Sequence, residues 1–239
     1  MGCNNTKPSS DYNESPTSSD RKLISSPGDE RWIPLFDGKS TNGWRNYQKK
    51  TAGKSWVVKD GTLILEVVSD GKGRTKTEDG GDLITVDQYE NYELSLEWKI
   101  SECGNSGVLF NVVEDKQYER VYHTGPEMQI LDNTCHPDAK IHTHRAGDLY
   151  DLIACSEEVV KPAGEWNQIL IRINAGQTEF FLNDQKVVEF MMFDQSWKER
   201  IAKSKFKDMP GFGKSQKGHI ALQDHGDAVA FRDIKIRML

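Results

Sequence analysis

Three short stretches of the sequence combine a carboxylate, an imidazole or side-chain amides with alternating apolar residues. They are Glu127-Met128-Gln129-Ile130-Leu131, Ile220-Ala221-Leu222-Gln223-Asp224-His225 and Gly107-Val108-Leu109-Phe110-Asn111. A carboxylate and an imidazole can exchange a proton with a substrate or hold a divalent metal ion. Amides offer both donors and acceptors, which suits hydroxyl-rich ligands such as sugars. These stretches therefore hold the candidate functional residues of the chain.

The alternation within each stretch predicts β-strands, in which neighbouring side chains point to opposite faces. Since Met128, Ile130 and Val108 suit a core, the polar residues project from the other face. The outward residues are then Glu127, Gln129, Asn111, Gln223 and His225. We expect this outward face to be solvated and to form a binding surface.

The elements that must position these residues are also mostly strands. Apolar and polar residues alternate over residues 92–100, and Ala175-Gly176 and Asn183-Asp184 are typical turn pairs. Predicted strands cover residues 56–58, 61–67, 92–100, 107–113, 127–131, 166–174, 178–182, 187–188, 219–223 and 230–238. One short helix is predicted over residues 195–205. Many short strands without alternating helices predict an all-β, two-sheet antiparallel sandwich or jelly roll.

The first 30 residues differ in composition from the rest of the chain. They are rich in Ser, Asn, Thr, Pro and Gly, and so bury too little apolar surface to offset the entropy of ordering. We predict a disordered tether over residues 1–30 and one folded domain over residues 31–239. Cys3 followed by a polar linker is typical of a processed bacterial lipoprotein that carries its lipid on that cysteine. The other interpretation is a disordered tail with an incidental cysteine.

Charge and hydropathy argue against two classes of partner. Lys and Arg total 31 against 37 Asp and Glu, a net charge of -6, whereas nucleic acid binding needs a concentrated positive surface. No apolar run approaches the roughly 18–20 residues that span a bilayer. A lipid on Cys3 is thus the only membrane attachment that we expect. The oligomeric state is left open.

The remaining cysteines have no zinc-type spacing. Cys103, Cys135 and Cys155 allow one disulfide with one free thiol, or three buried thiols. The sequence does not choose between these arrangements.

A series of motifs along the folded segment resembles one known family. They are Pro34-Leu35-Phe36-Asp37-Gly38, Gly43-Trp44, Gly104-Asn105-Ser106-Gly107, Glu127-Met128-Gln129-Ile130-Leu131-Asp132-Asn133, Ala146-Gly147-Asp148-Leu149-Tyr150-Asp151-Leu152, Pro162-Ala163-Gly164-Glu165-Trp166-Asn167 and Gly218-His219-Ile220-Ala221-Leu222-Gln223-Asp224-His225-Gly226. From Trp32 to Leu239 the chain resembles the 3-keto-disaccharide hydrolase domain family. The resemblance implies a concanavalin A-like jelly roll and export to the periplasm or outer membrane, often as a lipoprotein. It also implies glycoside substrates already oxidised to a ketone at C3 of the sugar.

The implied chemistry is an elimination. A C3 ketone acidifies the C2 proton, so a base can remove it, the C1 aglycone can leave, and water can add to complete net hydrolysis. We predict that Glu127 and His225 share the base role or hold a divalent metal ion, and we expect no organic cofactor. The residues predicted to orient the sugar are Asn105, Gln129, Arg145, Tyr150 and Gln223. Asn111 stands where members of the family often carry Arg, and we predict that it contacts a different sugar or aglycone.

Two other functions fit a sandwich fold. A non-catalytic, lectin-like carbohydrate-binding protein would bind glycans without turnover. An ordinary glycosidase would need a second carboxylate about 5–9.5 Å from Glu127. The sequence selects neither the sugar, the aglycone nor the metal.

Overall fold

The structure is a computed structural model that describes residues 1, 31–69, 71 and 74–239. Cys3 and nearly all of the predicted tether over residues 1–30 lie outside the described residues.

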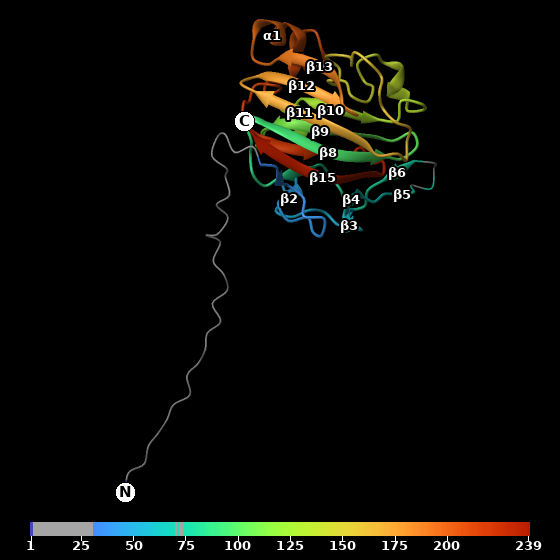
Figure 1. The fold of residues 1–239 in the computed structure, drawn as a ribbon, viewed down its shortest axis with the longest axis vertical. Helices are drawn as coiled ribbons and strands as arrows, with labels where there is room; N and C mark the ends of the chain where they lie inside the picture. Colours follow the sequence, from blue (N-terminus) through green and yellow to red (C-terminus); the bar gives the residue numbers. More distant parts are fainter. Residues whose placement is uncertain (2–30, 70, 72–73) are drawn as a thin grey trace.

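The larger sheet has eight strands. In spatial order these are β13 (Gln185–Met191), β12 (Gln177–Leu182), β11 (Asn167–Asn174), β8 (Tyr92–Ile100), β15 (Val229–Met238), β4 (Thr62–Leu65) and β3 (Trp56–Lys59), with β1 (Ile33–Pro34) paired to β15. Figure 1 shows β13, β12, β11, β8 and β15 side by side. All pairs in this sheet are antiparallel. Hairpin turns join the successive strands β11, β12 and β13.

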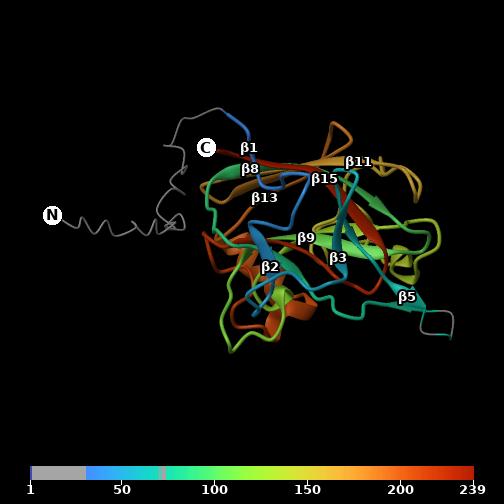
Figure 2. The same ribbon diagram turned by 90° about the horizontal axis from the view of Figure 1, so that it is seen from below.

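The smaller sheet has five strands and contains most of the three polar stretches 107–111, 127–131 and 220–225. Its order is β10 (Glu127–Leu131), β9 (Asn105–Val112), β14 (His219–Leu222), β7 (Leu83–Thr85) and β2 (Trp44–Asn46). A separate two-stranded ribbon joins β5 (Val68–Ser69) and β6 (Thr75–Lys76). Figure 2 shows the two layers, with β8 and β11 in one and β9 and β2 in the other.

The core lies between the two sheets. Phe110 of β9 meets Phe180 of β12 edge to face, with ring centroids 5.8 Å apart, and both side chains are fully buried. Trp98 and Tyr92 of β8 are also buried here. Burying each large aromatic ring removes apolar area from water, which drives the two sheets together. The predicted all-β antiparallel sandwich is therefore confirmed.

The helical elements are short. Helix α1 (Gln195–Ala202) begins after Asp194, whose carboxylate accepts a hydrogen bond from the Trp197 N–H at 2.7 Å. It ends three residues before the predicted boundary, because Ser204 caps a new 3-10 turn, η3 (Lys205–Asp208). Two further 3-10 turns are η1 (Val121–His123) and η2 (Pro137–Lys140). Within the described ranges, every helix is too short or too polar to cross a bilayer.

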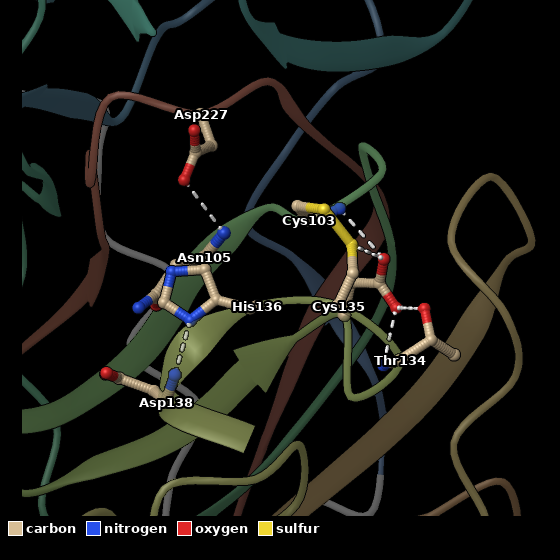
Figure 3. The surroundings of a disulfide bond; sticks show 8 residues. Cys103, Asn105, Thr134, Cys135, His136, Asp138 and Asp227 are labelled. Atoms are coloured by element: carbon tan, nitrogen blue, oxygen red, sulfur yellow. Dashed lines mark hydrogen bonds between the residues drawn. A yellow bond between two sulfur atoms is a disulfide. The ribbon is translucent and has the colours of Figure 1, made fainter. Parts of the chain in front are cut away.

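The structure decides the cysteine pairing that the sequence left open. Cys103 and Cys135 form a disulfide, and Cys155 is a half-buried free thiol. The Asp132 carboxylate accepts hydrogen bonds from the Cys103 N–H at 2.8 Å and from Thr134, so the loop after β10 is tied to the start of β9 (Figure 3). The disulfide thus joins the segment before β9 to the loop after β10.

Candidate active site

Strand register brings the predicted polar residues onto one face. Glu127 lies opposite Leu109, and Gln129 lies opposite Gly107 in the β10–β9 pair. Residues directly opposite in an antiparallel pair point to the same face. Asn105, two residues before Gly107, shares that face, so β9 and β10 together present a carboxylate and two amides.

Gln223 joins this group from the third strand. It follows β14 directly, and its N–H donates to the Gly107 carbonyl at 2.9 Å, which extends the β14–β9 pairing. Two residues later, His225 lies in a short loop that Asp224 holds in place. The Asp224 carboxylate accepts from the Gly226 N–H at 2.9 Å and from the Thr77 hydroxyl at 2.8 Å.

The expectation that this face is solvated is wrong. Glu127 is 6% exposed, Gln129 1% and Asn105 3%. The chain segment 147–150 covers the outer edge of β10, where the Gln129 N–H donates to the Asp148 carbonyl and the Tyr150 N–H to the Glu127 carbonyl, both at 3.0 Å. Sequence alternation marks a second face but does not say what other segments cover it.

A pocket of about 290 Å³ remains open above these residues. Its lining combines amide and charged side chains with aromatic rings and a methionine. Its lining residues are Asn105, Tyr122, Glu127, Gln129, Tyr150, Lys205, Phe206, Met209, Gln223 and His225. Six predicted site residues thus meet in one cavity: Asn105, Glu127, Gln129, Tyr150, Gln223 and His225.

Two predicted site residues do not line this pocket. Asn111 is 1% exposed and lies where the β9–β14 register shifts, and neither of its amide atoms has a partner among the described residues. The Arg145 side chain donates from Nε to the Ala139 carbonyl at 2.9 Å and pairs with Glu158. It therefore ties neighbouring loops together and does not reach the pocket.

Glu127 is the most perturbed acid in the pocket. Burial, and to a smaller extent the nearby Asp82 carboxylate, raises its pKa to about 8. The Lys205 ammonium and a hydrogen bond from Gln223 act in the opposite direction. The Gln129 amide adds a donor 3.2 Å from Glu127 Oε1 in the orientation that pairs its N–H groups with acceptors. A carboxyl poised near neutral pH is suited to both accept and return a proton.

Asp82, just before β7, is a neighbour that sequence reasoning missed. Burial raises its pKa to about 6, while the Asp224 N–H, which donates to its carboxylate at 3.0 Å, acts to lower the value. Asp82 does not line the pocket but shapes the charge around Glu127. A strand as short as β7 gives no alternation from which to find it.

Tyr150 forms a second buried cluster beside Glu127. Its ring lies against His144 at a centroid distance of 4.2 Å, and the Lys205 Nζ lies 3.8 Å from the centre of the Tyr150 ring. Burial and the surrounding carboxylates raise the pKa of the Tyr150 hydroxyl. His225 lies exposed at the pocket rim, edge to face with His136 at 6.4 Å.

The donors at this pocket do not fit a metal cage built by the protein alone. Among the described residues, three His, Cys, Asp or Glu donor atoms gather within 4.8 Å of one another only at Cys103, Asp132 and Cys135, and both cysteines are in the disulfide. The Gln223 and Gln129 amides act on Glu127 as hydrogen-bond donors, and Lys205 acts on it as a positive charge. A metal held by Glu127 and His225 stays a prediction.

Comparison with known proteins identifies the family. Residues 31–237 match the family described as the 3-keto-alpha-glucoside-1,2-lyase-like domain. The chain belongs to this family. A 3-keto-disaccharide hydrolase of Bacteroides thetaiotaomicron is 35% identical over 250 residues, covering 95% of this chain and 86% of that protein. The resemblance inferred from the motifs is confirmed.

Solved structures agree with membership in the 3-keto-alpha-glucoside-1,2-lyase-like family. A Parabacteroides distasonis protein assigned to the glycosyl hydrolases superposes with a TM-score of 0.78 at 31% identity, covering 87% of this chain and 94% of that one. A Bacillus subtilis protein with a galectin-like fold superposes with a TM-score of 0.56 at 15% identity, over 87% and 94% of the two chains. The second likeness shows the fold alone and confirms the jelly-roll class.

Proposed function

We propose that this protein is an enzyme that cleaves 3-keto-glycosides, among them 3-keto-disaccharides, by removing the C2 proton and eliminating the C1 substituent. Family membership and the Bacteroides relative support the substrate class. The observation that carries the mechanism is one buried carboxyl, Glu127, which lies in a small pocket rich in amides and has a pKa of about 8. Proton abstraction next to a ketone needs a base of this kind.

Glu127 acts first as the base. Its carboxylate takes the C2 proton, the C2–H electron pair forms a C2=C3 double bond, and the C3 carbonyl oxygen becomes an enolate. When the enolate returns to a ketone, the electron pair forms C1=C2 and the C1–O bond breaks. The products are an unsaturated keto-sugar and an alkoxide, which takes up one proton to become the free alcohol. Water added across C1=C2 completes net hydrolysis.

The alkoxide needs a proton donor where it leaves the sugar. We propose that His225, an imidazole at the exposed rim of the pocket, supplies or relays this proton. His225 and Glu127 then divide the acid and base work. This proposal differs from the predicted sharing of the base role, because it gives the base role to Glu127 and the acid role to His225.

The size of the pocket suits one sugar ring. A volume of about 290 Å³ is at the small end for ligand pockets, which run to about 1,000 Å³. Asn105, Gln129 and Gln223 offer donors and acceptors to the hydroxyls, while Tyr122 adds an aromatic ring to the lining. We propose that the keto-sugar binds inside and the aglycone extends past the rim.

The test uses 4-nitrophenyl 3-keto-α-glucoside beside the unoxidised 4-nitrophenyl α-glucoside. We expect nitrophenol release from the keto-substrate only, above an enzyme-free blank, and a loss of at least 100-fold in kcat for Glu127→Gln. Glu165→Gln, an exposed acid outside the pocket, is the matched control and keeps full activity. Cleavage of both substrates would favour an ordinary glycosidase. Binding without turnover would favour a lectin-like protein.

We propose that the enzyme works outside the cytoplasm, in the periplasm or at the outer membrane, anchored by a lipid on Cys3. The Cys103–Cys135 disulfide supports export, because disulfides persist in oxidising compartments. Cys3 lies outside the described residues, so the anchor rests on the sequence. Growth with an alkyne fatty acid, with Cys3→Ser as control, would label the intact protein and not the variant.

A further inference from the structure

A backbone hydrogen bond fixes the position of Lys205 at the pocket. It opens the η3 turn, and its N–H donates to Asp151 Oδ2 at 3.0 Å. The other oxygen of Asp151 meets His144 Nε2 at 3.0 Å. His144 is buried, so this connection fixes the start of the turn against the loop that carries Tyr150.

The Lys205 side chain is aimed into the cavity. Its ammonium lies 3.8 Å from the centre of the Tyr150 ring and 5.2 Å from that of Phe206, and all three side chains line the pocket. A cation over an aromatic face is stabilised without using its N–H donors. Among the described residues, no carboxylate pairs with this ammonium within the 4.0 Å limit of an ion pair. Its donors therefore remain free for a ligand.

The charge of Lys205 is matched to that of Glu127. Loss of water around the ammonium lowers the pKa of Lys205, while Asp151, Glu127 and Asp138 favour its charged form. The Lys205 charge in turn lowers the pKa of Glu127. A base and a cation thus act on one another across a single cavity.

Elimination from a keto-sugar is helped by such a cation. Negative charge builds on the C3 oxygen as the C2 proton leaves, and a fixed positive group near that oxygen lowers the barrier. Lys205 is the one Lys or Arg among the described residues that line the pocket, so the protein itself can supply this positive charge.

We propose that the Lys205 ammonium binds the C3 oxygen of the keto-sugar and stabilises the enolate that forms when Glu127 removes the C2 proton. This inference rests on the proposed function and adds a catalytic residue to it. The C2 proton goes to Glu127, and the C3 oxygen gains the negative charge that Lys205 balances. No redox step is involved.

The test compares Lys205→Met, Lys205→Arg and Lys203→Met with 4-nitrophenyl 3-keto-α-glucoside. Lys203 follows α1 and is exposed outside the pocket, so its variant controls for the loss of one surface charge. We expect kcat to fall about 100- to 1,000-fold for Lys205→Met, with KM changed less than tenfold. Lys205→Arg, which keeps the charge, recovers at least tenfold of that loss, and Lys203→Met behaves as the wild type.

Isotope exchange separates the chemistry from folding. In D₂O the wild type incorporates deuterium at C2 of a bound 3-keto-sugar, and Lys205→Met loses this exchange while its melting temperature stays within a few degrees.

If the wild type turns over and Lys205→Met keeps its kcat and its exchange, Lys205 has no such role. If Lys205→Met does not fold, equal kcat values for Lys205→Ala with and without added ethylammonium overturn the proposal, and rescue supports it. If the wild type itself never cleaves the substrate, the proposed function fails instead.

Discussion

The Glu127 carboxylate occupies the space that a side chain at Gly107 would fill. A Cβ placed on Gly107 would clash with Oε1, Cδ and Cγ of Glu127. The register sets up this contact, because Gly107 is opposite Gln129 and diagonal to Glu127 on the same face. The absent side chain of Gly107 is thus part of what positions the catalytic carboxyl.

Gly107→Ala is expected to displace the Glu127 carboxylate. Misplacing a reacting group by about 1 Å can cost about 100-fold in rate, and overpacking costs about 1–3 kcal/mol. We therefore expect kcat to fall roughly 100-fold and stability to fall within that range. A double-mutant cycle checks the cause: the loss of stability shrinks when Glu127→Ala removes the clashing carboxylate. An unchanged penalty in that background would show that Gly107 acts elsewhere.

Glu127→Gln is expected to stabilise the fold at alkaline pH. Burial raises the folded pKa to about 8 from 4.5, so between those values the unfolded chain ionises while the folded one stays protonated. The free energy of unfolding therefore falls as pH rises through this window, and the whole destabilisation by Glu127 is present above about pH 8. Thermal unfolding should give a variant that melts roughly 3–8 °C above the wild type at pH 9 and close to it at pH 4. Equal melting temperatures at both pH values would contradict a raised pKa.

The rate should follow the ionisation of the same group. A base works only when it is ionised, so kcat/KM is expected to rise with pH as the pH approaches the Glu127 pKa of about 8 from below. Loss of the opposing Lys205 charge raises that pKa, so Lys205→Met is expected to move the rise to higher pH. A profile that is flat between pH 6 and 9 would remove Glu127 from the proton transfer.

Individual residues show which parts of the fold and the site could be predicted from the sequence. Alternation within 127–131 correctly put Glu127 and Gln129 on one face, because β10 spans the predicted residues. Burial of that face depends on segment 147–150 and on η3, which are far away in the chain. Lys205 lies in a segment with several lysines, and only the folded structure distinguishes it, through its hydrogen bond to Asp151 and its place over the Tyr150 ring. Asn111 and Arg145 matched a polar pattern, but a register shift and a loop ion pair keep them out of the pocket.

Loss of the disulfide is expected to cost stability and then activity. Cys103 and Cys135 are 32 residues apart, and closing a loop of that size contributes about 2–4 kcal/mol. The bridge also anchors His136, whose ring packs against His225 at the rim. Cys103→Ser/Cys135→Ser should melt at lower temperature and lose several-fold in kcat, with Cys155→Ser as the free-thiol control. An unaltered melting temperature would mean that Asp132 alone holds the loop.

Chelation tests the metal predicted at Glu127 and His225. Because the described donors there form no cage, we expect prolonged dialysis against EDTA to leave kcat within twofold of its starting value. With a 3-keto-disaccharide, whose leaving alkoxide needs a proton, His225→Ala is expected to lose about 100-fold in kcat, and His142→Ala, an exposed histidine outside the pocket, to lose nothing. Activity that disappears with EDTA and returns with Mn²⁺ would instead establish a metal at the site.

The segment that covers β10 has a consequence for solubility. β10 is the last strand of its sheet, and an exposed last strand is a template on which another chain can add a strand. Gly147, Asp148 and Tyr150 use up hydrogen-bonding groups of that edge through Gln129 and Glu127. The same loop that completes the pocket therefore protects the protein from edge-to-edge aggregation, and loop changes that widen the pocket for larger substrates would also expose that edge.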